Sequence, residues 1–399
     1  MTSPLSLLQT SPYLSTMDPD MPPPVIYLSD TFSPSFPIQD PPPPGTNFGV
    51  VGLDRNVVWC ADPRMRDLLR HCASAPIPTA TAAHLFRADL VEEAVRRGWL
   101  QDPDSLCREF HLRTGQIEVT AHCNWGCAFC PVATDPKPRE TMPMDLFEEI
   151  VQKLVDLGTI EYVTFHFFNE PTLDKHFNER LEVLASHSMQ LVLFTNASGL
   201  NENKIDALKR LGVLRHLIVN LPSINEKEFA DLTRSRTYSR SRANLDRAID
   251  AGFPVKIVVN GVGQELVKNL SQLKERYEPL GVMVEPTMTC DRAGDVRGVY
   301  LQDVHVSGQL TGCGWPLTHA NISVSGDLFL CCNDYYQREI FGNVMDGSLS
   351  EIMRGDVATN ARRKVFGVSE AEDDFLCRKC HNQTLDFPGR EFRPISTFG

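Results

Sequence analysis

Residues 121–131 read Ala-His-Cys-Asn-Trp-Gly-Cys-Ala-Phe-Cys-Pro, and they place Cys123, Cys127 and Cys130 in a C-x3-C-x2-C pattern. Three thiolates this close in sequence can bind three irons of one 4Fe–4S cube, and such a cube takes four ligands. The fourth iron is left for a ligand that is not protein, as one coordination position is left open on a catalytic zinc. The stretch therefore predicts a reactive iron–sulfur cluster.

Two other uses of these cysteines fit the sequence less well. A structural zinc site usually takes paired C-x2-C or Cys and His ligands and needs a fourth donor, and His122 is badly placed to supply it beside Cys123. Disulfides are typical of oxidising compartments, whereas neither a signal peptide nor an apolar stretch of membrane-spanning length is visible. We therefore expect a cytoplasmic protein, not bound to a membrane, whose thiols bind metal.

The cysteine spacing, with the aromatic Phe129 before the last cysteine, resembles the radical S-adenosylmethionine (radical SAM) enzymes. The resemblance covers roughly residues 113–385. It implies that the open iron chelates the methionine moiety of SAM and that Phe129 belongs to the cofactor site. One electron from the cluster then cleaves the sulfonium, and the 5′-deoxyadenosyl radical abstracts a substrate hydrogen. The chemistry also implies flavodoxin or ferredoxin as electron donor.

Short apolar, β-rich runs alternate with helical patterns in the middle of the chain. Strands are expected at 116–120, 162–165, 191–194, 216–219, 255–259 and 282–285, and helices at 174–187, 201–211, 225–251 and 264–277. Such alternation predicts βαβ units and a parallel sheet in an α/β fold. Six units suit the partial (β/α)6 barrel of the resembled family, and the site of a parallel barrel lies at the C-terminal ends of its strands.

The ends of the second and third expected strands carry polar residues. Residues 167–171 read Phe-Phe-Asn-Glu-Pro, where the family usually has Gly-Gly-Glu-Pro, and the resemblance implies that Glu170 binds the amino group of SAM. Phe168 and Asn169 replace the glycines and make a close backbone approach less easy; a solvated carboxylate before a turn proline is the alternative. Thr195 and Asn196 resemble the family's Thr-Asn-Gly, which lines the cofactor floor.

Further candidates follow the fourth strand. Asn220 and Ser223 are expected to contact the ribose or carboxylate of SAM, although Asn, Pro and Ser also favour a simple turn. The resemblance implies that one arginine of the run at 233–242 binds the SAM carboxylate as a bidentate partner, and we favour Arg236. The formal net charge of −12 argues against a nucleic-acid-binding surface.

A second set of cysteines resembles the auxiliary-cluster domain called SPASM, or its shorter form, Twitch. The expected ligands of one auxiliary 4Fe–4S cluster are Cys313, Cys331, Cys377 and Cys380, with Cys332 as the alternative to Cys331. Four thiolates complete a cluster, so this one cannot bind SAM and either stabilises the fold or accepts an electron from the substrate. A structural zinc ribbon is the alternative.

The predicted domains follow one another along the chain. They are a disordered Pro-rich segment at 1–46, a small N-terminal module at 47–112, the barrel at 113–287, the SPASM/Twitch-like extension at 288–390 and a tail at 391–399. The module combines a possible hairpin with helices at 64–72 and 88–98. It loosely resembles a winged-helix peptide-recognition module, and a helical cap on the barrel is the alternative.

These patterns predict an oxidative radical SAM enzyme of natural-product or peptide-modification biosynthesis. The C-x17-C-x45-C-x2-C spacing resembles Twitch dehydrogenases that oxidise an aminocyclitol alcohol, so the substrate is either a sugar-like alcohol or a peptide. Two alternatives stay open. Cys290 could return a hydrogen atom to the substrate radical in a redox-neutral epimerase, or the chain could be a non-catalytic iron–sulfur or zinc scaffold that binds a partner protein.

Overall fold

The computed structural model describes residues 7–10, 15–17, 45, 48–51, 57–74, 77–261, 263–288, 291–296, 308, 310 and 313–380. The chain divides into two compact units. The first is drawn from Met1–His111, His305–Thr318 and Arg354–Gly399, and the second from Leu112–Val304 and His319–Met353. Within the described ranges, no helix has both the length and the apolar character needed to cross a membrane.

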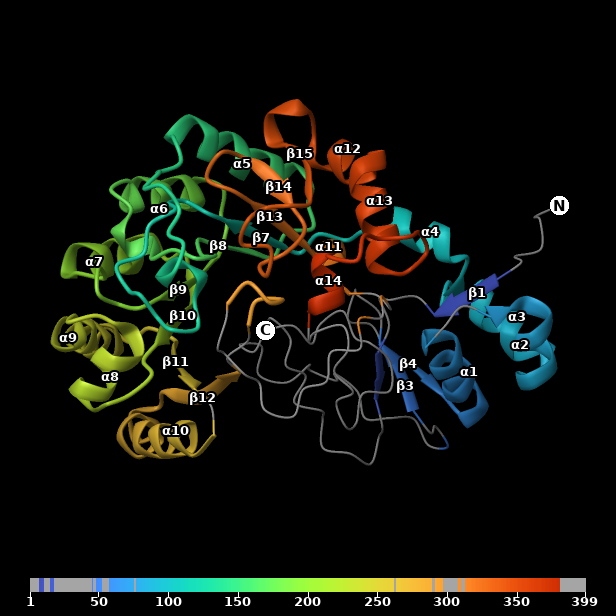
Figure 1. Ribbon diagram of the computed structural model, residues 1–399, viewed down its shortest axis with the longest axis horizontal. Helices are drawn as coiled ribbons and strands as arrows, with labels where there is room; N and C mark the ends of the chain where they lie inside the picture. Colours follow the sequence, from blue (N-terminus) through green and yellow to red (C-terminus); the bar gives the residue numbers. More distant parts are fainter. Residues whose placement is uncertain are drawn as a thin grey trace. The chain divides into compact units, whose positions relative to one another are not determined.

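Six parallel strands form the centre of the second unit (Figure 1). They are β7 (Thr114–Ile117), β8 (Tyr162–Thr164), β9 (Leu191–Thr195), β10 (Leu214–Asn220), β11 (Val255–Gly261) and β12 (Met283–Met288). Each strand pairs in parallel with the next along the chain. The predicted partial (β/α)6 barrel is therefore confirmed, and all six expected strands are present.

Helices connect these strands. They are α5 (Met144–Asp156), α6 (Phe177–Ser186), α7 (Glu202–Leu211), α8 (Glu226–Thr233), α9 (Tyr238–Asp250) and α10 (Gly263–Tyr277), with 3-10 turns at Pro131–Ala133, Pro171–Leu173 and Glu278–Leu280. The expected single helix at 225–251 is two helices, because Arg234 ends α8 in the left-handed region at φ 51°. Helix α5 was not predicted.

Aromatic and glycine contacts show which face of the sheet the helices cover. Phe165, which follows β8, packs edge-on against Phe147 of α5 and Phe177 of α6. A Cβ added at Gly115 of β7 would lie 2.7 Å from the Leu154 side chain of α5. Since side chains alternate between the two faces of a strand, the residues next to Phe165 and Gly115 face the opposite, inner side of the barrel sheet.

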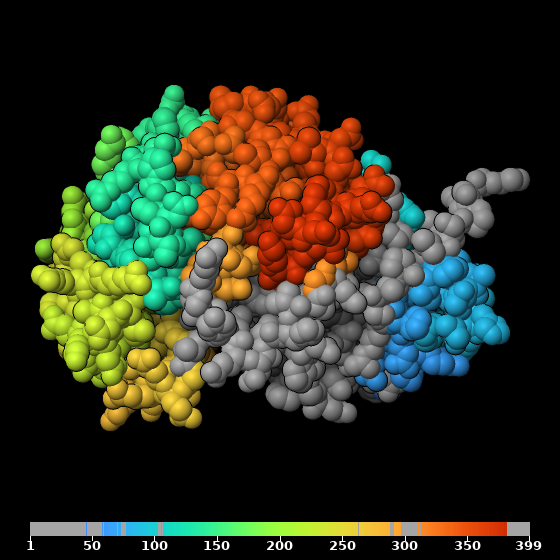
Figure 2. Space-filling view, viewed as in Figure 1, coloured from blue at the N-terminus to red at the C-terminus, as the bar shows by residue number. Residues whose placement is uncertain are grey.

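Three C-terminal strands extend the same sheet beyond β7. Strand β13 (His319–Ile322) pairs in parallel with β7, and β14 (Asp327–Phe329) and β15 (Ile340–Asn343) follow in antiparallel order. A 3-10 turn at Val344–Asp346 and α12 (Leu349–Arg354) follow. In Figure 2 the orange surface of these strands adjoins the green surface of the barrel. Main-chain hydrogen bonds therefore continue from the barrel sheet into the strands of the predicted extension, and the predicted boundary near residue 288 stays a prediction.

The first unit contains short strands and helices. The strands are β1 (Leu7–Thr10), β2 (Ser15–Met17), β3 (Phe48–Val51), β4 (Val57–Cys60), β5 (Ile77–Pro78) and β6 (Leu100–Gln101). The helices are α1 (Pro63–Ser74), α2 (Thr79–Phe86), α3 (Ala88–Arg96), α4 (Pro103–Arg108), α11 (Trp315–Thr318), α13 (Asp356–Val365) and α14 (Leu376–Lys379). Leu68, Leu69 and Trp99 belong to its buried core.

The predicted N-terminal hairpin is confirmed as the antiparallel pair β3–β4, and α1 and α3 match the two expected helices. The expectation of disorder was wrong for two stretches of residues 1–46, because β1 pairs with β5 and β6 and β2 pairs with β3. Pairing through main-chain groups does not require the periodic apolar residues on which the prediction depended. Except for residue 45, the rest of that segment lies outside the described residues.

Candidate active site

The cysteine loop follows β7 and is held by its own backbone. The Trp125 N–H donates to the Cys123 sulfur over 3.4 Å, and the Cys130 N–H donates to the Cys127 carbonyl over 3.0 Å. Burial raises the pKa of all three thiols, that of Cys123 to about 12, and the Cys130 and Cys123 sulfurs further raise the pKa of Cys127. The charges of Cys123 and Cys130 therefore act on the Cys127 thiol.

This donor set fits an iron–sulfur cluster. Within the part of the chain that the structure describes, no three His, Cys, Asp or Glu side chains gather as the ligands of a single metal ion do. A 4Fe–4S cube instead takes one thiolate on each iron, so its ligands are spread more widely than those of one ion. A thiol that coordinates a metal is deprotonated, and the charge of the metal offsets the cost of ionising a buried thiol. Cys123, Cys127 and Cys130 would hold such a cluster.

Glu170 lies at the end of the segment after β8, with its carboxylate buried (1% exposed). Its Oε2 accepts the Asn196 N–H over 2.6 Å, and its Oε1 accepts the Thr195 hydroxyl over 2.6 Å and the Thr172 N–H over 3.0 Å. Burial raises the pKa of Glu170, and these donors oppose that shift. A carboxylate offers about four acceptor positions, so Oε2 keeps capacity for an ammonium group. This geometry fits the role that the resemblance implies.

Thr195 and Asn196 act on Glu170 from the end of β9. The Thr195 hydroxyl also accepts the Ala197 N–H, over 2.9 Å. The Asn196 amide donates over 3.0 Å to Asn124 of the cysteine loop, and Asn124 donates over 2.9 Å to the Ser198 hydroxyl. The structure therefore brings the cysteine loop and two predicted residues together. Asn124 was not predicted, although its position inside the cysteine stretch could have suggested it.

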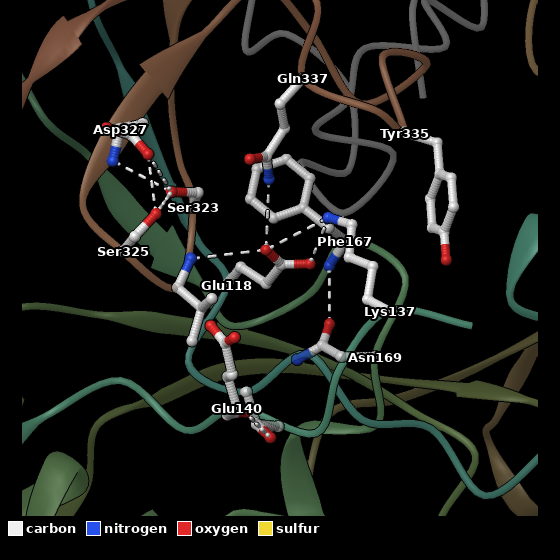
Figure 3. A network of polar contacts seen from close by, with 12 residues as sticks. Glu118, Lys137, Glu140, Phe167, Asn169, Ser323, Ser325, Asp327, Tyr335 and Gln337 are labelled. Atoms are coloured by element: carbon white, nitrogen blue, oxygen red, sulfur yellow. Dashed lines mark hydrogen bonds and ion pairs between the residues drawn. The ribbon is translucent and has the colours of Figure 1, made fainter. Parts of the chain in front are cut away.

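The Phe-Phe-Asn-Glu-Pro segment forms its turn without glycine. The side-chain oxygen of Asn169, Oδ1, accepts the Phe167 N–H over 2.8 Å, and the side-chain amide donates to the Phe165 carbonyl over 2.9 Å. Residues 167–169 have no positive φ. Figure 3 shows the Asn169 side chain directed at the Phe167 backbone. The asparagine side chain thus orders this turn, and the conformational freedom of glycine is not needed.

The two phenylalanines of this segment pack against the strands and loop that follow β13. The Phe167 ring lies 5.0 Å from the ring of Phe329, and the Phe168 ring meets Tyr335 edge-on at 4.8 Å. The guanidinium of Arg292 lies 5.4 Å from the centre of the Phe168 ring. Aromatic pairs of this kind stabilise by about 0.5–1.5 kcal/mol beyond their buried area. The phenylalanines therefore attach the C-terminal extension to the end of β8.

A buried carboxylate connects three segments at the C-terminal end of β7 (Figure 3). Glu118 accepts from Lys137, which follows the cysteine loop, over 3.1 Å. It also accepts, over 3.4 Å each, the Val324 N–H and the Gln337 amide from the C-terminal extension. The Lys137 ammonium lies 5.1 Å from the centre of the Tyr335 ring. Sequence reasoning missed this network, because its members are far apart along the chain.

In the arginine-rich run, Arg234 is the residue that lies beside the cysteine loop, whereas Arg236 was the favoured ligand of SAM. Arg236 is exposed, in the bend between α8 and α9. A Cβ added at Gly126 of the cysteine loop would lie 3.5 Å from the Arg234 side chain, and the Arg234 charge lowers the pKa of Cys127 against the larger effect of burial. Arg234 thus lies beside the cysteine loop. The role of Arg236 in binding the SAM carboxylate stays a prediction.

The residues after β10 have partners within the protein. The Asn220 side chain accepts the Asn260 amide over 2.9 Å. The Ser223 hydroxyl donates to Glu228 over 3.0 Å and accepts the Asn225 N–H over 3.0 Å. These contacts are those of a turn that leads into α8, which was the alternative interpretation of Ser223. Contacts of Asn220 and Ser223 with SAM stay predictions.

The expected auxiliary ligands are distributed between the two units. Cys377 and Cys380 are buried around the single turn of α14, where the Cys380 N–H donates to the Cys377 carbonyl over 3.3 Å, and Cys313 belongs to the same unit. Cys331 and Cys332 follow β14 in the other unit and are half-buried. The choice of these ligands stays a prediction. Cys290 lies outside the described residues, and Phe129 is half-buried in a turn of the cysteine loop.

Comparisons with known proteins match two parts of the chain to known families. The family model of the radical SAM superfamily matches residues 117–272, and that of the SPASM iron–sulfur cluster-binding domain matches residues 313–381. The chain is 22% identical over 278 residues to the S-adenosyl-L-methionine-dependent 2-deoxy-scyllo-inosamine dehydrogenase of Niallia circulans, covering 68% of this chain and 93% of that protein. It is 25% identical to a GTP 3′,8-cyclase of Vibrio cholerae, over 54% of this chain and 66% of the cyclase.

Solved structures share the fold. BtrN in complex with AdoMet and 2-DOIA aligns with a TM-score of 0.50 at 17% identity, over 73% of this chain and 99% of BtrN. Streptococcus suis SuiB bound to the precursor peptide SuiA aligns with a TM-score of 0.56 at 12% identity, over 94% and 95% of the two chains. With its cysteine loop at the end of β7, the chain belongs to the radical SAM superfamily and carries a C-terminal SPASM domain, so its cofactors are SAM, a 4Fe–4S cluster and an auxiliary iron–sulfur cluster.

Proposed function

We propose that this protein is a radical SAM oxidoreductase that removes two electrons from a small, sugar-like alcohol. The observation that carries the proposal is the similarity to the 2-deoxy-scyllo-inosamine dehydrogenase, which extends over 93% of that protein. The cysteine pattern supports it, because the chain has cysteines for a reactive cluster and four more for a closed one. A closed cluster can accept an electron and cannot bind SAM.

The residues of the site have separate tasks in this reaction. When bound, SAM and the first cluster supply a 5′-deoxyadenosyl radical, which takes a hydrogen atom. Glu170 binds the amino group of SAM, while Thr195 and Asn196 hold the Glu170 carboxylate in place. The alcohol loses one hydrogen atom to the radical, one proton to solvent and one electron to the auxiliary cluster, and becomes a carbonyl compound. Flavodoxin or ferredoxin provides the first electron.

The test is an anaerobic assay of the reconstituted protein with SAM, reduced flavodoxin and 2-deoxy-scyllo-inosamine. We expect 5′-deoxyadenosine and a ketone in equal amounts. Deoxyadenosine without any oxidised product would contradict the oxidation. An intact cluster that never cleaves SAM would instead favour the non-catalytic scaffold.

The same assay distinguishes two alternatives, a peptide substrate and an epimerase reaction. A peptide is the alternative substrate, and a precursor peptide encoded by a neighbouring gene would replace the aminocyclitol. The epimerase needs Cys290 as hydrogen donor, so a Cys290→Ala variant would change the stereochemistry of the product or stop turnover. Unchanged product and rate in that variant would remove the epimerase.

A further inference from the structure

Three polar side chains form what we call the inner polar row. Gln116 lies on β7, Thr164 is the last residue of β8, and His166 lies just after β8. Gln116 and Thr164 are direct partners in the parallel pairing, and His166 follows two residues after Thr164. Gln116 is 4% and Thr164 2% exposed. Gln116 Oε1, Thr164 Oγ1 and His166 Nδ1 are buried and have no hydrogen-bond partner among the residues that the structure describes.

The row faces the inner side of the barrel sheet. Gly115 and Phe165, the chain neighbours of these residues, face α5 and α6, and side chains alternate along a strand. The His166 ring stacks on Phe194 of β9, with ring centres 3.9 Å apart and planes at 26°. This stacking fixes the plane of the imidazole, so the row is an ordered surface.

Buried polar atoms without partners are rare in native proteins, because each loses its hydrogen bond to water and gains none in return. Three of them on adjacent positions point to a partner that binds there. The same strands continue to the cysteine loop and to Glu170. The row therefore lies on the same strands, a few residues before the segments that would hold SAM. In parallel barrels the substrate is bound at this C-terminal end.

We propose that the inner polar row binds the hydroxyl or amino groups of the substrate, and that the substrate is a compact polyhydroxylated ring. This inference rests on the proposed function and names its substrate class. Gln116 Oε1 can only accept, so the ligand must donate. The row spans about 5 Å between strands and about 7 Å along β8, which suits neighbouring ring substituents.

The charge of the row agrees with this ligand class. Burial lowers the pKa of His166 to about 3, and the Arg292 charge adds to the shift, so the imidazole is neutral at physiological pH. Gln116 and Thr164 are uncharged. The three side chains of the row are uncharged, and hydroxyl groups can both donate to them and accept from them.

Thr164→Val and Gln116→Leu test the proposal by calorimetric binding of 2-deoxy-scyllo-inosamine and scyllo-inositol to the reconstituted, SAM-loaded protein. We expect each variant to weaken binding by about tenfold, the factor that corresponds to one hydrogen bond of about 1.4 kcal/mol. The melting temperature of Thr164→Val should equal or exceed that of the wild type, because a methyl group replaces a buried hydroxyl without a partner.

Thr159→Val is the matched control. Its hydroxyl donates to the Leu112 carbonyl over 2.6 Å, so this variant should melt at a lower temperature and bind both ring compounds as the wild type does. A purely structural role of the row would make Thr164→Val behave like the control, with lower stability and unchanged binding, and would overturn the proposal.

The remaining outcomes separate the row from the reaction. If the wild type binds neither ring compound, the substrate class is wrong. If the wild type and Thr164→Val bind them equally well, the inner polar row does not bind the substrate, even where oxidation is observed. If binding depends on the row and no ketone forms, the binding role of the inner polar row is supported and the proposed oxidation is contradicted.

Discussion

Lys137 donates to both carboxylate oxygens of Glu118, over 3.1 and 3.4 Å, and this ion pair connects the segment after the cysteine loop to β7. The Glu118 side chain is 1% exposed and that of Lys137 22% exposed. A buried carboxylate without its counter-ion keeps the full penalty of desolvation. The position of the cysteine loop therefore depends on a charge pair that lies outside the cysteine motif.

Replacing Lys137 with methionine should destabilise the protein by about 3 kcal/mol, because Glu118 would be left buried and uncompensated. Urea unfolding of the reconstituted protein measures this. The double variant Lys137→Met, Glu118→Gln should recover part of the loss, since no buried charge remains. Lys274→Met is the control, because its ion pair with Glu278 is exposed (43% and 49%), and exposed pairs contribute about 0–1 kcal/mol. Equal losses in Lys137→Met and Lys274→Met would contradict the assigned role of burial.

Replacing Glu170 with glutamine should weaken SAM binding by about 10- to 100-fold, the range expected for one lost hydrogen bond to a charged group. The amide of glutamine would also meet the donors that now point at the carboxylate, the Thr195 hydroxyl or the Asn196 N–H. Equilibrium binding of SAM to the cluster-loaded protein is the measurement. Glu182→Gln, at an exposed ion pair, is the control and should bind SAM normally. Unchanged binding in Glu170→Gln would exclude Glu170 as the amino-group ligand.

The triple variant of Cys123, Cys127 and Cys130 to alanine should lose about four irons per chain and all cleavage of SAM. A Cys377→Ala, Cys380→Ala variant should lose the auxiliary cluster and keep the ability to cleave SAM without a substrate. Iron and zinc analysis with electron paramagnetic resonance checks both. Zinc in place of iron in the wild-type protein, removed by the second variant, would show that the C-terminal cysteines form a zinc ribbon.

Gly199→Ala should destabilise the protein by about 1–3 kcal/mol, the cost of forcing an extra methyl into a packed site. A Cβ at Gly199 would lie 2.6 Å from the Thr172 hydroxyl and 2.7 Å from its carbonyl oxygen. Thr172 donates to Glu170, so SAM binding should weaken as well.

Gly347→Ala is the matched control for Gly199→Ala. Its added Cβ would meet only the flexible end of Glu351, at 3.1 Å, and its φ of 169° is extended backbone that any residue adopts. Thermal unfolding and SAM titration of both variants decide the matter. A Gly199→Ala protein as stable as Gly347→Ala would show that the Thr172 segment adjusts freely.

Local patterns predicted the strands and named candidate residues for the site. The six parallel strands were predicted because each is a short buried run between helical patterns, and every one of them was found. The spacing of Cys123, Cys127 and Cys130 predicts a cluster, whereas the role of Glu170 is implied by the resemblance to the radical SAM family. Both assignments stay predictions. Such signals lie within a few consecutive residues, so they can be recognised without knowledge of the tertiary structure.

Contacts between distant segments were decided only by the tertiary structure. Arg236 was favoured from the sequence, but spacing could not choose among the arginines of the run. The tertiary structure brings Arg234, in a left-handed turn, beside Gly126 of the cysteine loop, and the role of Arg236 stays a prediction. Glu118 and Lys137 meet Gln337 because β13 pairs with β7, and that pairing uses main-chain groups that every residue has. Sequence by itself determined which chemistry the protein can hold, and the packing of its strands determined which side chains surround it.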